Sequence, residues 1–165
     1  GTSIMALIKL NNQSISAVTA LPSAVAVDSK PTFLVSRTSN QAIPNTTETI
    51  IQFNNEISDT SNVFNTSTYR FTPAVAGTYW ISACARMSAS EDFDIYTLTI
   101  MKNGSGIARV DKRHENNESL YIALLDIANT TDYYQISVYQ NSGGTRDLLG
   151  DNAEFTYFQG FKLIT

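Results

Sequence analysis

The chain has 165 residues and a formal net charge of −4 at pH 7, with 11 Lys and Arg against 15 Asp and Glu. This acidic balance excludes a nucleic-acid partner, because binding to phosphates needs a basic face that displaces counterions. Charged residues make up 16% of the chain and hydrophobic residues 42%, so the surface is weakly charged while the core is large enough to fold. The length fits one domain.

The N-terminal segment, residues 1–30, differs from the rest because it is rich in Ala, Ser and Val and is interrupted at Leu21-Pro22. We expect residues 1–4 to be a cloning remnant and Met5 to be the native start. The apolar stretch 4–10 is too short for the core of a signal peptide. Two interpretations stay open for this segment: an arm that docks on another protein, or a terminal strand that lies on the domain.

From Pro31 to Thr165 the hydrophobic pattern has a period of two residues, which indicates β-strands rather than helices. Val, Ile, Thr, Tyr and Phe, the common strand formers, dominate these segments. Turn signals separate them, most clearly Asn103-Gly104, where both residue types tolerate a positive φ. This predicts an all-β antiparallel sandwich over residues 31–165. The alternating positions are Phe33 and Val35, Thr49 to Phe53, Tyr69 and Phe71, Tyr79 to Met87, Tyr96 to Ile100, Tyr134 to Val138, and Phe155 to Leu163.

The segment 120–125 (Leu-Tyr-Ile-Ala-Leu-Leu) is apolar on both faces of its predicted strand. A strand of a two-sheet sandwich buries only one face in its own core. The second face therefore needs another cover, and a neighbouring subunit is the simplest one, since large exposed apolar patches are rare on monomers. The last strand places Phe158 on the face opposite Tyr157. The pattern thus predicts an oligomer.

Several motifs resemble the C1q/TNF-like jelly roll. Residues 69–82 are similar to its strand–Pro–Gly–aromatic–strand signature, with Phe71, Pro73, Gly77 and Tyr79 on the signature positions. Further matches follow the family's order, at Phe64-Asn65, Met101-Lys102-Asn103-Gly104, Thr131-Asp132-Tyr133-Tyr134, and Tyr157-Phe158-Gln159-Gly160-Phe161-Lys162-Leu163. Together the matches cover residues 31–165.

The resemblance implies a two-sheet jelly-roll sandwich that forms a homotrimer, with one sheet of each subunit facing the threefold axis. By resemblance, Phe71, Tyr134 and Phe158 are placed near the subunit interface. The alternative, that the three are ordinary core residues, stays open. The chain lacks the collagen-like stalk and the cysteine pair that are common in animal members, and it looks more like the C1q-like virion proteins of bacteriophages.

Catalytic chemistry has little support in the sequence. The one histidine, His114, stands in a polar loop, and nucleophilic catalysis needs a histidine held by a third group. The one cysteine, Cys84, stands in an apolar run and is expected to be buried. A zinc site needs three or four ligands, which these residues do not supply. Asp92 and Asp94 are candidate calcium ligands, with solvated loop carboxylates as the alternative.

The expected function is that of a non-enzymatic trimeric protein of a phage particle, either a receptor-binding tip or a capsid or tail decoration. The arm would dock on other virion proteins, and the loops 54–66, 88–94 and 141–151 would present amide, hydroxyl and aromatic groups to a host surface glycan. Two alternatives are a glycan-degrading enzyme that uses loop carboxylates and a soluble C1q-like lectin.

No stretch reaches the ~18–20 apolar residues of a membrane helix, so membrane insertion is not expected.

Overall fold

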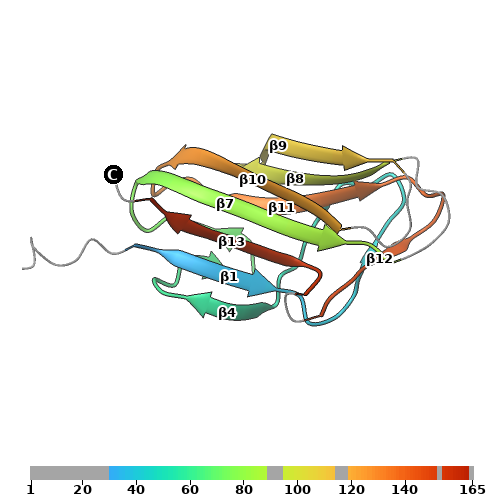
Figure 1. Cartoon of the computed structure of the whole chain (residues 1–165), viewed down its shortest axis with the longest axis horizontal. Helices are drawn as coiled ribbons and strands as arrows, with labels where there is room; N and C mark the ends of the chain where they lie inside the picture. Colours follow the sequence, from blue (N-terminus) through green and yellow to red (C-terminus); the bar gives the residue numbers. More distant parts are fainter. Residues whose placement is uncertain (1–29, 89–94, 114–118, 152–153, 164–165) are drawn as a thin grey trace, which may run out of the picture.

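The computed structural model describes residues 30–88, 95–113, 119–151 and 154–163. Most of its strands form two sheets that pack face to face, as Figure 1 shows. The all-β sandwich predicted from the period-two pattern is confirmed. Among the described residues there is no helix long and apolar enough to span a membrane.

The first sheet has five antiparallel strands, which lie side by side across the front of Figure 1. Neighbouring strands of this sheet are never consecutive in the chain, which is the pattern of crossing connections found in a jelly roll. In spatial order the strands are β10 (Ser119–Ala128), β7 (Gly77–Arg86), β13 (Tyr157–Lys162), β1 (Thr32–Ser36) and β4 (Asn55–Asp59).

The second sheet lies behind the first and is also antiparallel. Its path runs through β5 (Phe64–Asn65), β6 (Arg70–Phe71), β11 (Tyr134–Gln140), β8 (Tyr96–Lys102) and β9 (Ser105–Lys112), and β3 (Thr49–Ile50) pairs with β11. A separate pair joins β12 (Arg146–Leu148) to β2 (Gln41–Ile43).

An aromatic cluster fills the space between the sheets. The ring centroid of Phe33, from the first sheet, lies 4.4 Å from that of Phe71 in the second sheet and 4.8 Å from that of Phe158. Phe53 and Phe64 pack against the same group. Burial of such large rings is the main driving force for folding, at roughly 25 cal/mol per Å² of apolar surface.

The tight hairpin predicted at Asn103-Gly104 is confirmed. The two residues have φ values of 53° and 81° and join β8 directly to β9. Positive φ at both central positions matches the twist of a two-residue hairpin, which is why Asn followed by Gly is favoured there.

Tyr69 departs from its predicted place in a strand with Phe71. It has a φ of 58° and ends the turn between β5 and β6, so only Phe71 continues the inward alternation. The side chain of Asn65 stabilises this turn by accepting the backbone N–H groups of Ser67 and Thr68. Local turn hydrogen bonds therefore override the alternation.

Candidate functional site

One face of β10 points into the core and the other points to solvent. Leu120 and Ile122 are buried, whereas Tyr121, Leu125 and Ile127 are 50%, 61% and 73% exposed. The prediction that this strand is apolar on both faces is thus confirmed. Exposed apolar side chains gathered in one patch typically mark an interaction surface.

The exposed residues of β10 continue onto the neighbouring strands. Leu125 pairs with Trp80 on β7, and Trp80 pairs with Phe161 on β13. Residues in register on adjacent strands share a face of the sheet. The rings of Trp80 and Phe161 are 5.3 Å apart, and Phe161 is 40% exposed. We call Trp80, Tyr121, Leu125, Ile127 and Phe161 the outer apolar face.

Polar positions between these residues carry uncharged side chains. Gln159 and Ser82 are cross-strand partners on the same side of the sheet, and the Gln159 amide donates a hydrogen bond to the Ser82 hydroxyl at 3.2 Å. The centre of a protein interface is typically depleted of charge and enriched in aromatic residues. The outer apolar face has the composition of a subunit contact rather than that of a solvated surface.

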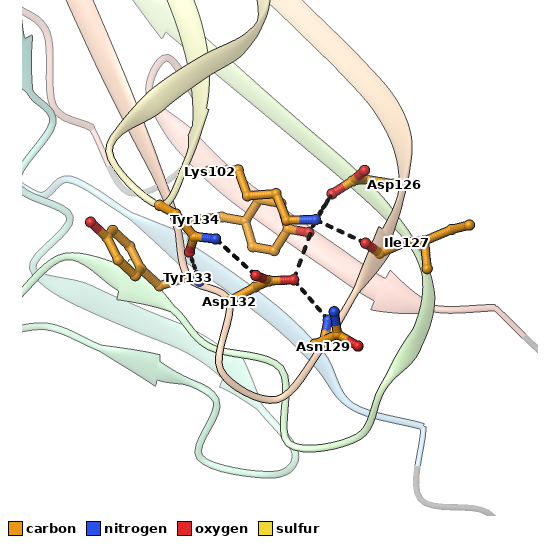
Figure 2. A network of polar contacts seen from close by, with 8 residues as sticks. Lys102, Asp126, Ile127, Asn129, Asp132, Tyr133 and Tyr134 are labelled. Atoms are coloured by element: carbon orange, nitrogen blue, oxygen red, sulfur yellow. Dashed lines mark hydrogen bonds and ion pairs between the residues drawn. The ribbon is translucent and has the colours of Figure 1, made fainter.

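A polar network at one end of the sandwich is the second feature of the molecule (Figure 2). The Lys102 ammonium lies 2.8 Å from Oδ2 of Asp126 and 3.3 Å from Oδ2 of Asp132, and it donates a hydrogen bond to the Ile127 carbonyl at 2.8 Å. The Tyr134 hydroxyl donates to Oδ2 of Asp126 at 2.5 Å. The cation therefore joins the end of β8 to the end of β10 and to the turn that follows.

The same network fixes the Asn103 hairpin. The Asn103 amide donates to Oδ1 of Asp132 at 2.8 Å, and its oxygen accepts the backbone N–H of Tyr133. Oδ2 of Asp132 in turn accepts the backbone N–H of Asn129 at 2.8 Å. The Asp132 carboxylate thus joins two turns, because one oxygen binds Asn103 and the other binds the backbone of Asn129.

These contacts shift the pKa values of Asp126, Lys102 and Tyr134. Burial raises the pKa of the Asp126 carboxyl, but the hydrogen bonds from Lys102 and Tyr134 outweigh burial and hold the pKa below its usual 3.8. Burial lowers the pKa of Lys102, but Asp126 and Asp132 outweigh burial and raise it above 10.5. Burial, together with the Asp126 carboxylate, raises the pKa of Tyr134. All three groups are held in their ordinary charge states, which suits a structural role rather than proton transfer.

The structure buries the three predicted interface residues inside the chain's own core. Phe71, Tyr134 and Phe158 have no exposed surface, which corresponds to the core alternative that the sequence left open. On β13 the two faces are reversed relative to the prediction, because Phe158 points inward and Phe161 points outward. Trp80, Ile127 and Phe161 were not among the predicted interface residues. Their alternation with core residues along their strands indicates that they face outward.

The remaining predicted site residues fall into two groups. Asp92, Asp94 and His114 lie outside the described residues. Cys84 is buried, as expected, and burial raises the pKa of its thiol. Within residues 30–88, 95–113, 119–151 and 154–163, no group of three or more His, Cys, Asp or Glu side chains is arranged to hold a metal ion.

Two of the three segments expected to be ligand-presenting loops contain β-strands. Residues 54–66 contain β4 and β5, and residues 141–151 contain β12. Between β4 and β5 the Asp59 carboxylate accepts the backbone N–H groups of Val63 and Phe64 at 3.0 and 2.8 Å. The loop amide and carboxylate groups are therefore partly used in turns. Residues 89–94 of the third loop lie outside the described residues.

Comparison with solved structures places the fold among C1q and TNF jelly-roll domains. The globular domain of zebrafish complement 1qA is similar over 81% of this chain and 98% of its own, with a TM-score of 0.57 and 19% identity. Murine APRIL covers 82% of this chain and 100% of its own, with a TM-score of 0.64 and 10% identity. Eiger TNF from S. frugiperda covers 82% and 92%, with a TM-score of 0.60 and 10% identity. At these identities the likeness establishes the fold alone.

No family model and no curated protein matches the sequence.

Proposed function

We propose that this chain is a non-enzymatic binding and structural protein that assembles as a homotrimer through its outer apolar face. The observation that carries the proposal is the row Leu125–Trp80–Phe161, which crosses three strands on the solvent side of the first sheet. A fully solvated row of this kind would cost free energy in proportion to its apolar area. The C1q/TNF-like resemblance implies the same arrangement, with one sheet of each subunit toward a threefold axis.

Mass in solution tests the assembly. Light scattering behind a sizing column should give three times 18.1 kDa, or 54.3 kDa, for the full chain. A monomer of 18.1 kDa at micromolar concentration would overturn the proposal.

A matched pair of substitutions tests the face. Ile127 is exposed on the outer apolar face, whereas Ile107 is exposed on β9 of the other sheet. Ile127→Asp should give a folded monomer, because a carboxylate in a dry interface costs several kcal/mol. Ile107→Asp should keep the mass of the trimer. Equal masses for the two variants would show that the subunits meet elsewhere.

We further propose that the trimer works on a phage particle, as a receptor-binding tip or a capsid or tail decoration, and that it recognises a host surface glycan. The support is the resemblance to C1q-like virion proteins together with the N-terminal segment, which precedes β1 at Thr32. Deleting residues 5–30 should leave a folded trimer that no longer joins the particle. Undiminished incorporation of the truncated chain into virions would refute the docking role of this segment.

A further inference from the structure

A hollow of about 390 Å³ lies on the outward side of the second sheet. Leu98 and Ile100 of β8 point into the core, so Thr99 between them faces outward and forms part of the hollow's wall. The volume falls within the roughly 300–1,000 Å³ of small-molecule pockets. The lining residues are Glu48, Thr99, Gly106, Ile107, Ala108 and Arg109.

A β-bulge shapes this hollow. Ile100 pairs with Ala108 and Met101 pairs with Gly106, which leaves Ile107 as an extra residue on β9. Gly106 keeps the space open because it has no side chain. A Cβ at this position would lie 3.1 Å from Cγ2 of Thr99 and would crowd that wall of the hollow. Bulges are common next to binding sites, where they change the direction in which side chains point.

Hydrogen bonds fix the polar groups of the hollow. The fully buried Ser137 hydroxyl donates to Oε1 of Glu48 at 2.8 Å, which orients the exposed carboxylate. On β9, Nε of Arg109 donates to Oδ1 of Asp111 at 2.6 Å, and Nη2 donates to the Thr97 hydroxyl at 3.2 Å. An acceptor and a donor are therefore both held in place at one hollow.

The charges of these groups select the class of ligand. A free anion would be repelled by Glu48, and the charge of Arg109 is already paired with Asp111. The guanidinium of Arg109, which lies in the same lining, weakens the attraction of the Glu48 carboxylate for a free cation. A neutral ligand rich in hydroxyl groups can donate to the Glu48 carboxylate and accept from the Arg109 guanidinium without either unfavourable effect. Ile107, which is 43% exposed, offers an apolar contact for the ring carbons.

We propose that this hollow binds a neutral saccharide unit through its hydroxyl groups. This inference rests on the proposed function, in which the protein recognises a glycan, and it names the binding site and the chemical class of that glycan. The hollow lies on the second sheet, whereas the outer apolar face lies on the first. Assembly through that face therefore leaves the hollow open to solvent.

The test is binding of the labelled full chain to an array of neutral oligosaccharides built from glucose, galactose, mannose and N-acetylglucosamine. Sialylated and phosphorylated glycans form an anionic arm, and deacetylated amino sugars form a cationic arm. We expect a neutral glycan to bind best. Calorimetric titration of that glycan should show at least tenfold weaker binding for Glu48→Gln, because hydrogen bonds to a charged acceptor are the stronger ones. Gly106→Val should abolish binding by filling the hollow.

Glu56→Gln is the matched control, since Glu56 is an exposed carboxylate on β4 of the other sheet. Its affinity should stay within twofold of that of the wild type. Binding confined to either charged arm, binding to no neutral glycan, or equal binding by wild type and Glu48→Gln would overturn the inference. If circular dichroism shows that Gly106→Val does not fold, the affinity of Glu48→Gln alone decides whether the inference holds. The mass of the same samples reports separately on the trimer, so a monomer that binds sugar would refute only the assembly.

Discussion

The indole ring of Trp80 and the phenyl ring of Phe161 lie 5.3 Å apart, with 34° between their planes, on the side of the first sheet that faces away from the core. Offset aromatic pairs add about 0.5–1.5 kcal/mol to the value of area burial alone. On the opposite side of β13, Phe158 lies fully buried among the rings of the core. One short strand therefore contributes both to the core of the chain and to the surface through which we propose that the chains assemble.

Phe158 and Phe161 form a matched pair for separating these two roles. Phe158→Ala should lower the free energy of unfolding by about 3–5 kcal/mol, because it removes a fully buried ring and leaves a cavity. Phe161→Ala should instead weaken the trimer and change the unfolding midpoint mainly at low protein concentration. Urea denaturation at several chain concentrations checks both effects. A larger concentration-independent loss for Phe161→Ala than for Phe158→Ala would contradict the assignment of the two faces.

The Lys102–Asp126 ion pair predicts how stability depends on pH. Because the folded pKa of Asp126 lies below 3.8, its stabilising contribution is present above this pH and is lost as the pH falls through the folded value. Because the folded pKa of Lys102 lies above 10.5, its contribution is present below this pH and is lost as the pH rises through the folded value. Stability from this pair should therefore be greatest between the two limits.

Denaturant titrations of wild type and Asp126→Asn at pH 7 and at about pH 3 check this dependence. The wild type should be the more stable protein at pH 7, and the difference should shrink at the lower pH, because this pH lies below the ordinary value of 3.8 and approaches the lowered pKa of folded Asp126. A difference that is the same at both pH values would show that the charge of Asp126 does not contribute.

Tyr134→Phe isolates a single hydrogen bond of the network. The variant removes the hydroxyl that donates to Oδ2 of Asp126 and leaves the ring in the core. We expect a loss of about 1.5–3 kcal/mol in unfolding free energy, the range for hydrogen bonds to charged groups. Tyr139→Phe is the control, because Tyr139 lies on the same strand but is only half-buried. Equal effects of the two substitutions on the urea midpoint would argue against this role of the Tyr134 hydroxyl.

Gly150 and Gly144 allow a test of close backbone packing. A Cβ at Gly150 would lie 2.3 Å from the carbonyl oxygen of Ser39, whereas one at Gly144 would meet no atom within 4 Å. Gly150→Ala should therefore displace the backbone next to β12 and cost about 1–3 kcal/mol, as overpacking typically does. Gly144→Ala should be nearly neutral. Thermal unfolding of the two variants side by side measures the difference, and equal midpoints would refute the close approach.

The alternation of residues in the sequence was enough to predict most strands and their inward positions. Tyr79 to Met87, Leu98 and Ile100, and Ile136 and Val138 alternate as expected, and their inward side chains are buried. Asn103-Gly104 predicted its hairpin because positive φ is a local property of these residues. Tyr69 was placed wrongly, because the side-chain hydrogen bonds of Asn65 close the turn before it.

The candidate sites were harder to predict, because each depends on residues that are distant in the chain. Ser137 and Glu48 are 89 residues apart, and Asn103 and Asp132 are 29 apart. No spacing rule in a single sequence connects such pairs. The resemblance to a known fold gave the architecture but left two positions open for Phe71, Tyr134 and Phe158, near a subunit interface or in the core, and the structure buries all three within one chain.

By itself, the sequence of this protein determined an all-β sandwich with one strand, residues 120–125, apolar on both faces. Local backbone preferences and the two-residue repeat carry that information within a few positions of each residue. Only the tertiary structure decided which apolar residues face outward, because alternation defines two faces of a strand but does not say which face another sheet covers. Phe158 and Phe161 lie in the same strand and have opposite environments, since only one side of β13 meets the second sheet, where Phe158 packs against Phe64.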